Sequence, residues 1–183
     1  MSDELQAHIE EYKSTQEVLH TRYQVEHNIH YWSFILLSVS IPASFQLYGK
    51  SNYKYFLLIT PIPFYLLALM LLRNDLIIAA NAKYYNKTLR PKVEKIVGHQ
   101  VWAREDAISS TRKGGFNLFL GVCRYGTTMI SFPIFILIYF KSQNSLLSND
   151  WYGNGLLFIN IVAFIFISSN IYRVKKAVED IVN

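Results

Sequence analysis

Residues 55–91 read YFLLITPIPFYLLALMLLRNDLIIAANAKYYNKTLRP, and this stretch decides the fold. Residues 55–72 contain no charged side chain, and a run of about 20 apolar residues is what an α-helix needs to cross a bilayer core. After Arg73 and Asp75 the sequence becomes amphipathic and basic, with no further Gly or Pro before Pro91. The pattern predicts a helix that leaves a membrane, continues into water and ends at Pro91.

Three other uncharged stretches resemble it, at residues 31–49, 125–140 and 151–172. The chain is 51% hydrophobic and only 17% charged, and the charges gather between these stretches. Aromatic residues concentrate at the ends of the stretches, as they do at membrane boundaries. We expect spans at 31–49, 55–72, 116–140 and 153–172. The predicted fold class is all-α, a single membrane domain (1–183) built as a four-transmembrane-helix bundle; the alternative is a soluble bundle with unusually apolar helices.

Residues 1–30 read as one long cytoplasmic helix that precedes the first span. Apolar and then polar residues recur at alternating spacings of three and four, which is typical of a coiled-coil seam. Such a stripe would either pair with a second copy or dock on the chain's own inner helices. The predicted oligomerisation residues are Leu5, Ile9, Tyr12, Leu19 and Tyr23; the seam turns polar at Gln16, Glu26 and His30.

Orientation follows from the distribution of Lys and Arg. The N-terminal helix, the segment 73–115 and the tail 173–183 together carry 14 basic residues, whereas the two opposite hairpins carry only three. The positive-inside rule therefore places both termini and the helical extension after the second span in the cytoplasm of a plasma-membrane protein. Val93, Ile96 and Val97 suggest that this extension rests on the membrane surface or on the N-terminal helix.

Arg124 is the most informative single residue, because a charge at the end of an apolar span is a functional candidate. It would lie just inside the inner end of the third span, at the depth where Asp75 follows the second. We predict an ion pair between Asp75 and Arg124; the alternative is that Arg124 extends to lipid headgroups.

Polar residues inside the spans form a second candidate group. They would make hydrogen bonds between helices or line a wet lumen, within one protomer or along an oligomer axis. These residues are Ser33, Ser40, Ser44, Thr127, Thr128, Ser131, Asn160 and Asn170.

The cytoplasmic basic residues form a third group, which can bind anionic phospholipid at about 1 kcal/mol per residue near the surface. Determining topology is the alternative role, and the two are compatible. The predicted lipid-binding residues are Lys83, Lys87, Arg90, Lys92, Lys95, Arg112, Lys113, Arg173, Lys175 and Lys176.

Several function classes find no support. There is no phosphate-binding loop, nucleophile motif or cysteine-rich metal site, and no span contains Asp or Glu. We therefore expect no enzyme activity, no cofactor and no metal. The basic residues form no dense tract or nucleic-acid-binding motif, so direct nucleic-acid binding is not expected.

Three short motifs carry a resemblance over roughly residues 10–140: Glu11-Tyr12-Lys13 followed by Arg22, residues 74–78 (NDLII), and Tyr84-Tyr85 followed by residues 89–91 (LRP). Together they resemble small prokaryotic four-span proteins found beside antiviral systems, as membrane accessories of CRISPR loci or membrane effectors of short Argonautes. The resemblance implies a cytoplasmic protein partner and an effector that perturbs the membrane when triggered.

Three functions are compatible with these features. The first is an oligomeric inner-membrane effector that binds anionic lipid and permeabilises or depolarises the membrane in antiviral defence. The second is a non-conducting anchor that recruits a cytoplasmic partner through the N-terminal helix and residues 83–113. The third is a small channel or transporter, although its halves show no residue-level similarity of the kind that inverted repeats leave.

Overall fold

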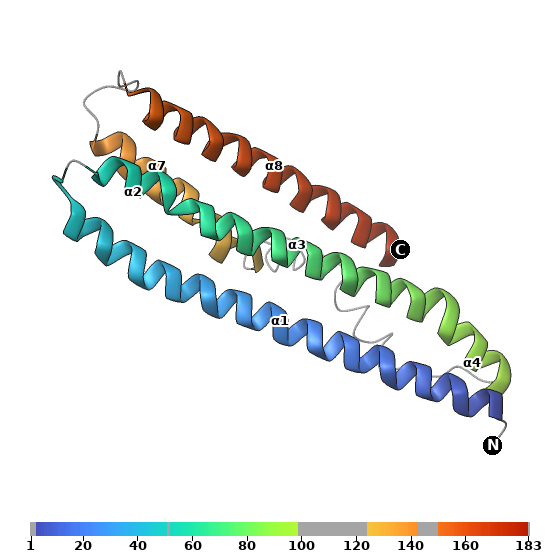
Figure 1. The fold of residues 1–183 in the computed structure, drawn as a ribbon. Helices are drawn as coiled ribbons and strands as arrows, with labels where there is room; N and C mark the ends of the chain where they lie inside the picture. The colour runs from blue at the N-terminus through green and yellow to red at the C-terminus, as the bar shows by residue number, and fades with distance from the viewer. Residues whose placement is uncertain (1–2, 51, 99–123, 143–149, 183) are drawn as a thin grey trace.

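The computed structural model describes residues 3–50, 52–98, 124–142 and 150–182, and every regular element within them is helical (Figure 1). This confirms the all-α prediction for the described part of the chain. Residues 124–129 are also helical and lead into α7. The other elements are α1 (Asp3–Leu47), α2 (Tyr53–Ile59), α3 (Pro61–Tyr84), η1 (Tyr85–Leu89), α4 (Arg90–Val97), α7 (Ser131–Ser142) and α8 (Trp151–Val182).

Helix α1 has 45 residues and combines the predicted cytoplasmic helix and first span in one element. At about 1.5 Å per residue it is about 65 Å long, roughly twice the thickness of a bilayer core. Asp3 and Glu4 in its first turn favour the positive end of the helix dipole. Pro42 lies inside the helix without ending it, and Gly49, with a φ of +80°, begins the turn towards α2.

The chain from α2 to α4 forms a second long helical segment. Thr60 keeps helical dihedral angles, and Pro61 takes a first-turn position in α3, so the helix passes through the proline pair. The prediction that Pro91 ends the helix is wrong: Pro91 lies in the first turn of α4, which ends at Val97 and is capped by Gly98. The π turn of η1 comes directly before α4. Its wider turn makes room for Pro91, whose ring nitrogen cannot donate a backbone hydrogen bond.

The C-terminal part supplies the remaining helices. Helix α8 runs without interruption to Val182, so Arg173, Lys175 and Lys176 of the predicted tail belong to the same helix as the predicted fourth span. The beginning of the predicted third span (116–123), most of the segment 92–115 and the loop 143–149 lie outside the described residues.

Among residues 3–50, 52–98, 124–142 and 150–176, three apolar clusters hold the helices together along their length. The first lies near the hairpin ends, where Leu57 and Leu58 of α2 pack against Phe135 of α7. The second, in the middle, joins Ile29 of α1 to Leu71 of α3, Ile167 of α8 and other residues. The third lies near the N-terminus, where Leu5 and Tyr12 of α1 pack against Tyr85, Leu89 and Val93.

Within the part of the chain that the structure describes, two helical segments, Tyr53–Val97 and Trp151–Lys176, are long and apolar enough to cross a membrane. Helix α3, which belongs to the first of these segments, is the central helix of the bundle. It contacts α1, α7 and α8 (Figure 1). Half of the most apolar part of Tyr53–Val97 is buried by its neighbours, whereas only 17% of the corresponding part of Trp151–Lys176 is buried. Helix α8 therefore presents most of its apolar surface outward.

Candidate functional site: a charged cluster joining three helices

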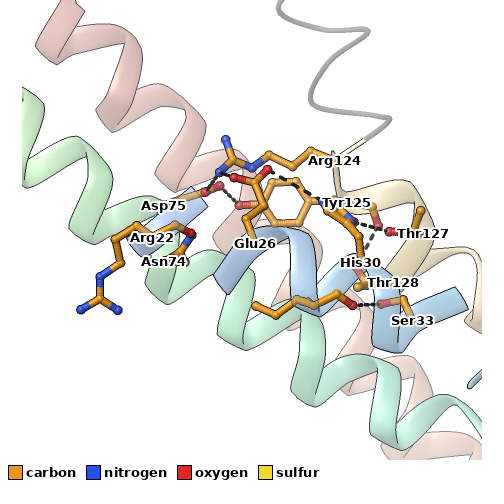
Figure 2. Close-up of polar contacts among 11 residues, drawn as sticks. Arg22, Glu26, His30, Ser33, Asn74, Asp75, Arg124, Tyr125, Thr127 and Thr128 are labelled. Atoms are coloured by element: carbon orange, nitrogen blue, oxygen red, sulfur yellow. Dashed lines mark hydrogen bonds and ion pairs between the residues drawn. The ribbon is translucent and has the colours of Figure 1, made fainter. Parts of the chain in front are cut away.

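Arg124 joins α1 and α3 through one nitrogen. Its Nη2 lies 2.5 Å from Asp75 Oδ1 of α3 and 2.5 Å from Glu26 Oε2 of α1 (Figure 2). The two carboxylates are 11% and 18% exposed, which limits the competition from water. The sequence pointed to the contact with Asp75, whereas the structure gives Arg124 two acidic partners.

Neighbouring polar side chains extend this contact. The hydroxyl of Tyr125 donates a hydrogen bond to Asp75 Oδ2. His30 Nδ1 lies 2.9 Å from Thr127 Oγ1, and its Nε2 lies 3.8 Å from Glu26 Oε1. We call Glu26, Asp75, Arg124 and Tyr125 the charged cluster; His30 and Thr127 border it on the side of the apolar core.

The positions of Glu26 and His30 in the sequence indicate that both face inward. Both lie on the coiled-coil seam of α1, at positions where apolar residues are expected. A charged residue at an inward-facing position requires a buried partner. That partner comes from residues 124–127, about 100 positions further along the chain, and spacing within one helix cannot identify it.

The charged cluster lies between two different parts of the bundle. On one side is the middle apolar cluster, which includes Ile29, Leu72 and Tyr125. On the other side, Asn74 Nδ2 donates a 3.0 Å hydrogen bond to the carbonyl oxygen of Arg22, while the Arg22 guanidinium points away (Figure 2). Beyond Arg22 the exposed surface of α1 becomes polar. The cluster therefore marks the change from an apolar to a polar segment of the bundle.

Most of the predicted polar span residues are buried, and most bond to carbonyls of their own helices. Ser33, Ser44, Thr128 and Ser131 each donate to a carbonyl three or four residues earlier. Ser40 is half-buried, Thr127 contacts His30, and Asn170 donates to Phe166 within α8. These hydrogen bonds satisfy the hydroxyl and amide groups inside a packed bundle. The polar residues can therefore be explained without a water-filled lumen.

Asn160 is the polar span residue that joins helices. Its Nδ2 donates 2.8 Å hydrogen bonds to the carbonyl of Leu58 in α2 and to that of Leu156 in α8. Its Oδ1 accepts a hydrogen bond from Tyr65 of α3, so all the polar atoms of this fully buried side chain have partners.

The predicted lipid-binding residues separate into two groups. Lys83, Lys87, Lys92 and Lys95 are exposed on α3, η1 and α4, and Arg90 bonds to Glu94 at 2.9 Å. Arg173, Lys175 and Lys176 lie on α8, after Ile167 and Ile171, which pack in the middle cluster. Arg112 and Lys113 lie outside the described residues.

The predicted oligomerisation residues of α1 divide in a similar way. Leu5 and Tyr12 pack on the chain's own third cluster, which is the docking alternative for the apolar stripe. Ile9 and Leu19 are half-buried, and Tyr23 is 47% exposed. Tyr84 donates a hydrogen bond to Glu11 nearby, and this bond lowers the pKa of the Glu11 carboxyl.

A second ion pair fixes the opposite end of the bundle. Lys54 Nζ lies 2.6 Å from Asp150 Oδ2, joining the beginning of α2 to the beginning of α8. The hydrogen bond from Lys54 is the main reason that the pKa of the Asp150 carboxyl is below its usual value. No sequence pattern marks this pair, because both residues lie in hairpin regions where charges are ordinary.

Among the described residues, no group of three or more His, Cys, Asp or Glu side chains is arranged to hold a metal ion. No family model, no curated protein and no solved structure matches the chain. The resemblance to membrane proteins of antiviral systems therefore rests on its three short motifs alone.

Proposed function

We propose that the chain is a four-span plasma-membrane effector with both termini in the cytoplasm, which binds anionic lipid and permeabilises or depolarises the membrane as an oligomer. The observation that carries the proposal is an inside-out distribution of side chains along α1, α3, α7 and α8. Large apolar side chains point outward, for example Phe45, Leu137 and Phe166, which are 74%, 68% and 60% exposed. Ser33, Thr128, Ser131 and Asn160 are fully buried.

A bilayer explains that distribution, because lipid covers apolar side chains at no cost while polar groups must find partners inside the protein. Exposed aromatic residues support a boundary at each end: Tyr48, Trp151 and Tyr152 at the hairpin end, and Trp32 and Tyr172 towards the charged cluster. Because the cluster lies close to Trp32 and Tyr172 along the helices, it belongs at the inner boundary.

The same placement decides which basic residues reach lipid. Val174 of α8 still packs against the middle apolar cluster, which includes Tyr125, so Lys175 and Lys176 follow directly after the packed part of α8 and belong in the headgroup layer. Lys83 and Lys95 follow Asp75 by about 12 Å and about 30 Å along the helix, at about 1.5 Å per residue. The headgroup layer is only about 5–8 Å deep. Anionic lipid therefore contacts the α8 residues, and the lysines of η1 and α4 extend beyond it.

The effector role, in preference to a passive anchor, is supported by the position of the charged cluster. The cluster lies where the cytoplasmic part of α1 meets the membrane part of the bundle, and it joins three helices through side chains alone. A bound partner can therefore change these contacts while the helices stay folded. The short-motif resemblance to membrane effectors of antiviral systems points the same way.

Topology is tested by cysteine labelling in a Cys123→Ser background. Lys50→Cys, in the first hairpin, should react with a membrane-impermeant maleimide from outside intact spheroplasts, whereas Lys83→Cys should react only after permeabilisation. Labelling of both positions from the same side would exclude the four-span arrangement.

Activity is tested by dye release from vesicles that contain the purified protein. We expect release from vesicles with anionic lipid and little from purely zwitterionic vesicles. Arg173→Gln, Lys175→Gln and Lys176→Gln together should abolish the dependence on anionic lipid, whereas Lys13→Gln, at an exposed position of α1 far from the headgroup layer, should retain it. Vesicles that stay tight in every lipid would favour the non-conducting anchor.

A further inference from the structure

The cytoplasmic end of the bundle is a two-helix stalk with charge of opposite sign on its two outer faces. We define the stalk as residues 3–22 of α1 packed against residues 76–97. Figure 1 shows these two segments side by side, extending past the end of α8. The apolar contacts that join the two segments come from their inner faces.

The outer face of α1 is acidic. Asp3, Glu10 and Glu17 are exposed and recur every seven residues, which places them in one line along a helix. Each lies two residues from a side chain on the inward side of α1, namely Leu5, Tyr12 and Thr15. Two residues correspond to about half a turn, so the acids point away from α3. Lys13 is the exposed basic residue that accompanies this acidic stripe.

The outer face of the second segment is basic. Lys83, Lys87 and Lys95 are exposed, and we call them the basic stripe. Lys87 lies two residues from both Tyr85 and Leu89, which pack on α1, so it points to the opposite side. Lys83 and Lys95 lie two residues from Tyr85 and Val93 in the same way, so they share this outer side. Lys92 is adjacent to Val93 and lies near Glu11 of α1, whose pKa is lowered mainly by the hydrogen bond from Tyr84 and also by the charge of Lys92, so it is not counted in the stripe.

The two stripes cover the same length of the stalk. The hydrogen bond between Tyr84 and Glu11 fixes the level of one helix against the other, and Leu5 packs in the cluster of Leu89 and Val93. The acidic stripe therefore overlaps the basic stripe over most of its length, and Glu17 extends about one helical turn beyond the level of Lys83.

From this arrangement we infer that the acidic stripe of one copy binds the basic stripe of a neighbouring copy, so that the stalks assemble head to tail into a closed ring or an open chain. The inference rests on the proposed function, because a shared membrane gives all copies the same orientation and height. Under that restriction the two stripes of neighbouring copies face one another over most of their length. Such a contact uses different surfaces of the two copies. A pair of copies therefore keeps one free acidic stripe and one free basic stripe, to which further copies can bind.

The test reverses each face separately and then mixes the two variants. The acid-face variant carries Glu10→Lys and Glu17→Lys, and the base-face variant carries Lys87→Glu and Lys95→Glu. Each alone presents two faces of like charge, and we expect its association constant to fall by about tenfold or more. A one-to-one mixture restores both contacts, because each reversed face meets the reversed face of the other variant.

Assembly is measured as particle mass in nanodiscs at low and high salt, with helical content by circular dichroism as the folding control. Lys50→Glu with Lys141→Glu is the matched control, since it also reverses two exposed lysines but lies at the hairpin end; it should assemble like the wild type. Single-face variants that assemble normally, a mixture no better than its components, or a wild type that is monomeric at low salt would each overturn the inference. Because particle mass is read independently of dye release, assembly without leakage would reject the effector function and leave the stalk contact standing.

Discussion

Glu26 and Asp75 lie on two different helices, α1 and α3, yet both carboxylates contact the same nitrogen of Arg124. Three helices thus depend on one guanidinium for the balance of charge at the inner end of the apolar bundle. A chain with only one acid at this level would form an ordinary ion pair. The cluster contains two acids and one cation, so removing each member changes the local charge in a different way. Mutations of the three residues can therefore be told apart by their effects.

Replacing Arg124 by Gln should destabilise the protein more than removing an exposed arginine. The change leaves Glu26 and Asp75 close together without a cation, and breaking a buried pair costs about 3–5 kcal/mol. Because Arg124 is 29% exposed, we expect a smaller loss, about 2 kcal/mol. Thermal unfolding in detergent micelles measures it, with Arg73→Gln, an exposed position two residues before Asp75, as the control. Equal effects at the two positions would show that the cluster is not a stabilising contact.

Exchanging the charges of Asp75 and Arg124 should fail to restore stability, although a simple pair would tolerate it. In the Asp75→Arg and Arg124→Asp double variant, the carboxylate introduced in place of the guanidinium faces Glu26, so two acids meet. Adding Glu26→Gln removes the repulsion, and we expect this triple variant to be more stable than the double variant. The order of their unfolding temperatures decides the matter; a double variant as stable as the wild type would mean that Glu26 is not part of the cluster.

Changing Asn160 to Asp should destabilise the bundle without altering its shape. The Asn160 amide donates to the carbonyls of Leu58 and Leu156, whereas an ionised carboxylate would place negative charge against both. Leaving buried polar groups unpaired costs about 1–3 kcal/mol each, so the loss should exceed about 2 kcal/mol. Asn170→Asp is the matched control, because Asn170 bonds only within α8 and is partly exposed. Similar unfolding temperatures for the two variants would argue against Asn160 as a contact between helices.

How far the sequence predicted these features depends on whether the information is local. Residues 55–91 predicted a helix that continues past its apolar part because apolar runs and helix periodicity are properties of one segment. Pro91 was misread because the π turn before it depends on how Tyr85 and Leu89 pack against α1. Matching depths pointed to the contact between Asp75 and Arg124. The part played by Glu26 could not be derived, since it needs the lateral arrangement of α1 and residues 124–127, which spacing along one helix does not encode.

The ion pair between Lys54 and Asp150 should give the hairpin end a stability that disappears in acid. The pKa of Asp150 is lowered in the folded protein, mainly by the hydrogen bond from Lys54. The unfolded chain therefore takes up its proton at a higher pH than the folded chain does. The stabilisation is present above the unfolded pKa of about 3.9 and is lost as the pH falls through the lower folded value. Asp150→Asn should lower the unfolding temperature at neutral pH, and its difference from the wild type should shrink steadily between about pH 5 and pH 2. Curves that stay parallel over this range would mean that the Asp150 carboxylate does not stabilise the fold.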